Sequence, residues 1–213
     1  MTQTAIHRRL LVGATLLAVA GMRSRASAEV PAGAVAPVQQ LCDGLLTIMR
    51  AGHSVPFAQR FNQLAPVVEK VFDLHTILQV SVGPTWSTLS PDQQATLEAA
   101  FRRYTVASYV SNFDEYSGQR FDVSPNVRDL PNGELVVDTR IVPQDPAGET
   151  HVLDYVMRQG PQGWRAVDVL MDGTISRVAV QRSDFRDLLA HGGAAALAKS
   201  LQQKTANLSG GAA

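Results

Sequence analysis

The amino-acid sequence predicts an α+β domain in which helices pack around a curved, mainly antiparallel sheet of about four strands. Three observations support this prediction. Apolar residues recur at helical spacing from Pro37 to about Tyr116, a strand-like period with regular turns follows, and helical spacing returns after Gly173. A block of strands between two blocks of helices is typical of α+β folds, because α/β folds alternate the two kinds of element.

Two helices are expected in the first part of the chain. Pro37 suits the first position of a helix, where its missing N–H costs nothing, and the apolar spacing continues to Gly52. A second helix is expected to begin near Ser54 and Pro56, and Pro66 is expected to interrupt or kink it. Each carries apolar residues along one side, which predicts packing against a core.

A shorter helix is expected over residues 74–82, because Gly83 and Pro84 end the apolar pattern there. Ser90 then marks the start of a longer helix. Its hydroxyl can cap the free amides of the first turn while the Gln93 side chain reaches back. The stripe that we expect on this helix consists of Leu97, Phe101, Tyr104, Ala107 and Ser108.

The strand region is divided by short turn sequences such as Asn132-Gly133, which join neighbouring antiparallel strands. The four expected strands are residues 120–127, 134–142, 150–158 and 163–171. Beyond Gly173 two helices are expected, separated by Gly192-Gly193, and the second runs from residue 194 to about 204. Residues 209–213 are expected to form a flexible tail.

The expected strands do not alternate cleanly between apolar and polar residues, as a sheet with one wet face should. Leu153, Tyr155 and Met157 point to one side, but Val152 and Val156 point to the other. The last strand has the same conflict between two sets: Trp164, Ala166 and Leu170 against Val167, Val169 and Met171. Either both faces of the sheet are covered, or one of them lines a pocket for an apolar molecule.

Residues 1–28 predict a cleaved secretory signal peptide. Arg8 and Arg9 precede an uncharged run of 13 residues, and a small-residue cleavage site ends at Ala28. At about 1.5 Å per residue this run covers roughly 20 Å, less than the ~30 Å hydrocarbon layer of a membrane. We therefore expect cleavage before Glu29 and a soluble, exported protein, with either Sec or twin-arginine export.

The composition of the expected mature chain excludes some classes of protein. Removal of residues 1–28 takes away four arginines and leaves 15 basic and 19 acidic residues, a poor surface for nucleic acid. Cys42 is the single cysteine, so no internal disulfide forms. Its place in an apolar helical pattern predicts a buried, inert thiol.

The residues give no support for catalysis, a metal site or a cofactor, so we expect that the protein is not an enzyme. His53 and His75 lack neighbouring ligands at metal-binding spacing, and no phosphate loop or dinucleotide fingerprint is present. Asp154 and Asp168 lie on neighbouring expected strands. They form either an acid–base pair or, as we expect, solvated or structurally hydrogen-bonded carboxylates.

Several short patterns follow one another along the chain in a characteristic order. They are Phe72-Asp73, Gly83-Pro84-Thr85-Trp86, residues 89–94 leading into Phe101 and Tyr104, Leu153-Asp154-Tyr155, residues 163–169, Gly173, Arg182-Ser183-Asp184-Phe185 and Gly192-Gly193. In order and spacing they resemble the MlaC family of exported lipid-binding proteins. This family, also called the toluene-tolerance auxiliary group, includes the hopanoid-associated HpnM proteins. The resemblance covers nearly all of the chain after residue 28.

The resemblance implies a single lipid-binding domain over residues 29–208 with an NTF2-like, cone-shaped fold around an apolar pocket. It implies a periplasmic carrier that holds phospholipid acyl chains and shuttles the lipid between two membranes. The implied partners are an inner-membrane ABC-type transporter with an MlaD-like subunit and an outer-membrane MlaA-like lipoprotein. We expect a monomer without a cofactor.

Three alternatives remain open on the sequence alone. In the first, the protein is a carrier whose cargo is a hopanoid or another polycyclic lipid, as the HpnM proteins suggest. In the second, it is an exported enzyme that uses Asp154 or Asp168. In the third, it is an interaction domain whose apolar faces are covered by a partner protein.

Candidate pocket residues follow from the strand pattern and from the resemblance, and ordinary core packing is the alternative role for each. They are Phe101, Tyr104, Leu153, Tyr155, Met157, Trp164, Val167 and Val169. We expect no catalytic and no metal-binding residue.

Overall fold

The computed structural model describes residues 29–210. The expected signal peptide, residues 1–28, and residues 211–213 of the expected tail lie outside the described residues. The helices are α1 (Glu29–Ala51), α2 (Phe57–Val71), α3 (Leu74–Val82), α4 (Pro91–Asn112) and α5 (Arg177–Leu208), with 3-10 turns at Gly52–Ser54 and Gly83–Thr88. The strands are β1 (Arg120–Asp129), β2 (Leu135–Val142), β3 (His151–Gly160), β4 (Gly163–Met171) and β5 (Ile175–Ser176).

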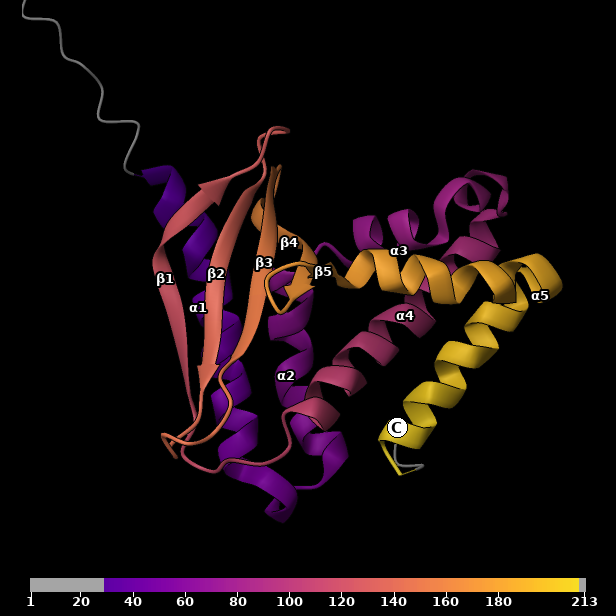
Figure 1. Ribbon diagram of the computed structural model, residues 1–213. Helices are drawn as coiled ribbons and strands as arrows, with labels where there is room; N and C mark the ends of the chain where they lie inside the picture. Colours follow the sequence, from indigo (N-terminus) through magenta and orange to yellow (C-terminus); the bar gives the residue numbers. More distant parts are fainter. Residues whose placement is uncertain (1–28, 211–213) are drawn as a thin grey trace, which may run out of the picture.

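The strands form one antiparallel sheet in the order of the sequence, β1-β2-β3-β4-β5. In Figure 1, α1 and α2 lie along one face of this sheet, while α3, α4 and α5 gather beyond its β4–β5 edge. The arrangement confirms the predicted α+β class. The two-residue strand β5, which the sequence pattern did not reveal, adds a fifth strand at the edge next to α5.

Helix α1 begins before Pro37, so the prediction that this proline opens the helix was wrong. A proline inside a helix removes one hydrogen bond and crowds the preceding turn. The helix nevertheless continues, because its apolar side is entirely buried against the sheet and α2. The fully buried residues on this side are Ala34, Val38, Leu41, Cys42, Leu45 and Ile48.

Helix α2 also continues through a proline, Pro66, which was expected to interrupt or kink it. Pro66 and Asn62, whose carbonyl loses its partner, are both exposed, so water can replace the missing hydrogen bond. The opposite side of α2 holds the helix in place through buried Leu64, Val68 and Val71. Within residues 29–210, no helix is both long enough and apolar enough to cross a membrane.

The start of α4 was predicted correctly. The Ser90 hydroxyl accepts a hydrogen bond from the Gln93 backbone N–H at 3.3 Å, and the Gln93 side-chain oxygen accepts from the Ser90 N–H at 2.9 Å. This reciprocal pair satisfies two amides that the first helical turn leaves free. It fixes where α4 begins and therefore which of its side chains face the sheet and α5.

A bulge at Val167 explains why the strands did not alternate cleanly. Val156 pairs with Asp168, whereas Met157 pairs with Ala166, so Val167 has no partner on β3. One extra residue turns the following side chains to the other face. Ala166 before the bulge and Val169 after it therefore both pack in the main core.

The opposite face of the sheet carries a separate, smaller apolar cluster around Val136, Val156 and Val167. Ion pairs lie on the same sheet: Arg128 binds Asp138 at 2.8 Å, and Arg158 binds Glu134 at 2.6 Å. Both faces of the sheet thus carry apolar residues, but only those on the face toward the helices belong to the main core.

Helix α5 consists of two helical segments joined at Gly193, as the Gly192-Gly193 pair predicted. Gly193 has φ 63° and ψ −162°, a conformation almost restricted to glycine. The first segment packs on α3 and α4 next to the sheet edge, and Figure 1 shows the second segment turning back alongside α4. The hinge lets one element cover two sides of the helical layer.

Candidate functional site

A partly open cavity of about 130 Å³ lies where β3 and β4 meet α3, α4 and the start of α5. Its wall is mostly apolar and aromatic. The sheet contributes Leu153, Asp168, Val169 and Met171, the α2–α3 connection and α3 contribute Phe72, Leu74 and Ile77, α4 contributes Phe101, Tyr104, Thr105, Ser108 and Tyr109, and α5 contributes Arg177, Val178 and Gln181.

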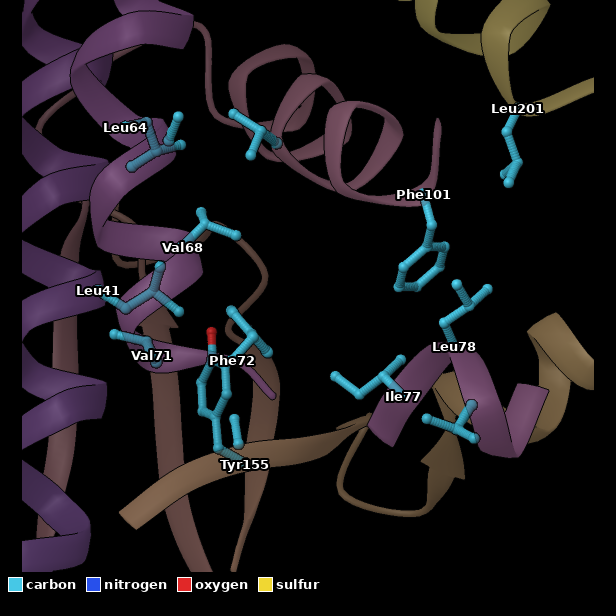
Figure 2. Close-up of a cluster of buried hydrophobic side chains, with 14 of the residues drawn as sticks. Leu41, Leu64, Val68, Val71, Phe72, Ile77, Leu78, Phe101, Tyr155 and Leu201 are labelled. Atoms are coloured by element: carbon cyan, nitrogen blue, oxygen red, sulfur yellow. The ribbon is translucent and has the colours of Figure 1, made fainter. Parts of the chain in front are cut away.

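Two groups of side chains approach this cavity from opposite sides. In Figure 2, the Phe101 ring of α4 points toward Ile77 and Leu78 of α3, and Ile77 points toward Phe72, which lies beside Tyr155 of the sheet. The rings of Phe72 and Tyr155 are 6.2 Å apart, and those of Phe72 and Tyr109 are 5.5 Å apart. Aromatic rings thus lie on both sides of the cavity, with Phe72 and Tyr109 on one side and Phe101 on the other.

Four of the eight sequence-predicted pocket residues line the cavity. The positions on α4 are one turn apart, and those on the strands lie on the core face of the sheet. They are Phe101, Tyr104, Leu153 and Val169. The structure brings these residues together around one space, and their contact with a lipid remains a prediction.

Tyr155 and Met157 are fully buried on the same face of β3 but lie in the packed core rather than in the cavity lining. The Tyr155 hydroxyl is buried and has no hydrogen-bond partner within residues 29–210. Burial raises the pKa of this hydroxyl well above its ordinary value, so it stays neutral. Burial also raises the pKa of the Cys42 thiol to about 12, as expected for an inert cysteine.

Trp164 and Val167 lie away from the cavity. Trp164 packs on α1, where a Cβ atom added to Gly33 would come within 3.1 Å of the Trp164 ring. Val167 belongs to the small apolar cluster on the far face of the sheet. The bulge separates Val167 from Val169, although strict alternation places them on the same side.

The two carboxylates considered as an acid–base pair have separate structural partners. Asp154 pairs with Arg128 at 2.7 Å and accepts a hydrogen bond from the Thr139 N–H at 3.2 Å. Asp168 accepts from the Val178 N–H at 3.0 Å and from the Val169 N–H at 2.7 Å. Burial raises the pKa of Asp154, while its bonds to Thr139 and Arg128 act in the opposite direction.

Asp168 makes structural hydrogen bonds, and these help to cap the start of α5. Its carboxylate also accepts a hydrogen bond from the Ser176 hydroxyl, and the Ser176 hydroxyl oxygen accepts from the Ala179 N–H at 3.0 Å. Together these groups satisfy free amides of the first turn of α5. Asp168 therefore joins β4 to α5 at the edge of the cavity.

Residues 29–210 contain no cluster of metal-ligating side chains. No three His, Cys, Asp or Glu side chains of this part of the chain lie together in a metal-binding arrangement. His75 is hydrogen-bonded to Glu98 at 2.8 Å on the surface, and His53 lies 3.5 Å from Asp114.

Sequence reasoning missed the contribution of α5 to the cavity, above all Arg177 and Gln181. A helix-start signal places them one turn apart, but it does not place the helix in space. The sequence signal that could have placed α5 beside the cavity is the turn just before this helix. Asp172 and Gly173 both have positive φ, 52° and 72°, and this reversal returns the chain to the end of β4.

The fold and the cavity together define an α+β domain with a pocket suited to an apolar molecule. The chain belongs to the MlaC family, because the family model described as MlaC protein matches residues 39–203. A solved structure of similar fold is the phospholipid-binding protein from Ralstonia solanacearum, in complex with a phospholipid. It matches with a TM-score of 0.68 and 23% sequence identity, over 82% of this chain and 98% of that chain.

Proposed function

We propose that this protein is a periplasmic phospholipid carrier that holds acyl chains in the cavity between the sheet and helices α3, α4 and α5. The observation that carries this proposal is an apolar cavity at the centre of a domain of the MlaC family. The complex of the Ralstonia solanacearum protein with a phospholipid supports the choice of ligand.

The need for a carrier follows from the exposure of lipid chains to water. Two acyl chains with roughly 30 methylene groups, at about 0.8 kcal/mol each, cost on the order of 20 kcal/mol to expose. A lipid therefore crosses an aqueous compartment only when a protein covers most of its apolar area. The proposed route connects an inner-membrane ABC-type transporter that has an MlaD-like subunit with an outer-membrane MlaA-like lipoprotein.

The size of the cavity requires that the carrier opens to load. A cavity of about 150 Å³ accommodates benzene, with six carbon atoms. The cavity of about 130 Å³ seen here is thus far too small for two acyl chains. Under this proposal, loading separates the walls of the cavity.

The identity of the cargo is tested by native mass spectrometry of protein purified gently from the periplasm, followed by organic extraction. The proposal expects one phospholipid per protein molecule. A bound hopanoid would keep the carrier mechanism and change its cargo. Protein that is empty and takes up no lipid from phospholipid vesicles would contradict the proposed function. A stable dimer on size-exclusion chromatography would favour a domain whose apolar faces meet a partner protein.

The location of the lipid is tested by Leu153→Glu. Leu153 lines the cavity, so a carboxylate there should abolish lipid retention, because neither the acyl chains nor the apolar wall can solvate it. Extraction of the purified variant measures bound lipid, and circular dichroism confirms that it is folded.

The matched control for this variant is Val152→Glu, because the neighbouring side chain points to the opposite face of β3. It should retain lipid like the wild type. A Leu153→Glu protein that unfolds would identify Leu153 as a core residue. A folded variant that still holds lipid would place the acyl chains elsewhere.

A further inference from the structure

The cavity lining contains one positively charged residue within the described chain, Arg177, which is the first residue of α5. Its side chain is partly buried. The rest of the wall is dominated by aromatic and aliphatic groups. A cation at the edge of an apolar cavity is costly unless an anion or strong acceptors compensate it.

No residue in the described part of the chain forms an ion pair with Arg177. The one carboxylate in the lining, Asp168, accepts hydrogen bonds from Ser176, Val169 and Val178 instead. Arg128 on β1, by contrast, binds two aspartates. Arg177 thus lines a cavity without an ion-pair partner among the described residues.

Arg177 shares the cavity lining with Tyr109. Burial raises the pKa of Tyr109, a lining residue on α4, and the positive charge of Arg177 partly offsets this effect. An arginine presents up to five N–H donors in a fork that matches the oxygens of a phosphate or carboxylate. An anionic group placed here would therefore lie directly beside the apolar space.

Two further polar groups lie in the same lining. Gln181 lies one helical turn after Arg177, and its side-chain amide is 3.3 Å from the Ser81 hydroxyl oxygen, whose proton is donated to the Ile77 carbonyl at 2.8 Å. The Thr105 hydroxyl oxygen on α4 is buried and has no partner within residues 29–210. The lining thus combines one cation, the hydrogen-bonded carboxylate of Asp168 and neutral polar side chains, among them Gln181, Thr105 and Ser108, with a larger apolar wall.

We propose that Arg177 binds the anionic group of the cargo, the phosphodiester of a glycerophospholipid, while the acyl chains occupy the adjacent cavity. This inference rests on the proposed carrier function and specifies its substrate class. It predicts discrimination against lipids without an anionic group, which include diacylglycerol and neutral polycyclic lipids. A fatty-acid carboxylate offers the same chemistry to Arg177, and the test separates the two sources.

The test measures binding of three pure lipids to delipidated full-length protein, each presented in the same detergent micelles. The lipids are dioleoylphosphatidylglycerol, dioleoylglycerol and oleate. Arg177→Gln should weaken phosphatidylglycerol binding about tenfold or more, because it removes charge-assisted hydrogen bonds, and should leave dioleoylglycerol binding unchanged. Arg177→Lys, which keeps the charge, should recover much of the loss.

The control variant is Arg182→Gln, since Arg182 is exposed on the same helix and lies outside the cavity lining. It should bind all three lipids like the wild type. The inference is overturned if Arg177→Gln binds phosphatidylglycerol normally, even if it loses oleate, or if it loses phosphatidylglycerol and dioleoylglycerol equally. In each of these cases the wild type still binds lipid. A wild-type protein that binds none of the lipids contradicts the proposed function as well.

Discussion

At the scale of single residues, Asp73 shows how one side chain fixes a wall of the cavity. Its carboxylate accepts hydrogen bonds from the Thr76 N–H at 3.0 Å and the Thr76 hydroxyl at 2.7 Å, and it caps the start of α3. The Asp73 N–H donates to the Ala166 carbonyl at 2.9 Å, which joins α3 to β4. Leu74 and Ile77 are positioned by these bonds.

The charge of Asp73 should make stability depend on pH. Burial alone would raise its pKa, but the bonds from Thr76 and the charges of Arg165 and His75 outweigh burial and lower it. The ionised form therefore stabilises the fold above the unfolded-state pKa of about 3.9, and this contribution is lost as the pH falls through the lower folded-state pKa.

We expect Asp73→Asn, which can still cap α3, to lower the free energy of unfolding by about 0.5–1 kcal/mol at pH 7. The difference from the wild type should shrink as the pH falls below about 4. Urea unfolding of both proteins across this range measures it, with the exposed Asp184→Asn as control. A difference that does not change with pH would mean that the charge is not the cause.

The sequence predicted the role of a residue where the local pattern determines that role. It missed the role where the three-dimensional placement of an element determines it. The Ser90–Gln93 capping box could be derived from four consecutive residues, because both partners lie in one helical turn. Phe101 and Tyr104 also follow from helical spacing. Arg177 could not be found in this way, because its position depends on how the chain reverses after β4.

At the scale of elements, boundaries of β4 were predicted correctly but the faces of its residues were not. Alternation assumes that each residue of β4 pairs with one residue of β3. Val167 is an extra residue without a partner on β3, so this assumption fails there. The prediction began α1 at Pro37 and had Pro66 interrupt or kink α2, whereas both helices run through their prolines with their apolar sides buried. In each case long-range packing overrides a local rule.

The bend of α5 should depend on glycine at position 193. Its φ of 63° and ψ of −162° place any residue with a Cβ atom in a strained conformation. Gly193→Ala should therefore lower the free energy of unfolding by about 1–3 kcal/mol. Chemical denaturation measures this change.

The control for this substitution is Gly160→Ala. Gly160 does not have a positive φ, and a Cβ atom added to it would meet nothing within 4 Å. This variant should therefore unfold like the wild type. An equally mild effect of Gly193→Ala would show that the two segments of α5 can rearrange without cost.

At the scale of the whole molecule, the small cavity links stability to loading. Ser108 lines the cavity, and Ser108→Leu should partly fill it. Filling a cavity commonly adds about 0.5–2 kcal/mol of stability. We therefore expect a protein that is more resistant to urea and takes up less phospholipid from vesicles.

Ser111→Leu on the same helix is the matched control, since Ser111 is outside the lining. It should leave lipid uptake unchanged. Normal uptake by Ser108→Leu would show that the acyl chains enter a different space.

The position of α5 in the chain has a consequence for how the protein is made. Every other wall of the cavity is encoded before residue 177, and the sheet needs only short connections between neighbouring strands. A growing chain that ends at residue 176 therefore leaves Phe101, Ile77 and the core side of β4 open to water. Until α5 has been synthesised and has folded over these residues, the nascent chain exposes an apolar surface and is prone to aggregation.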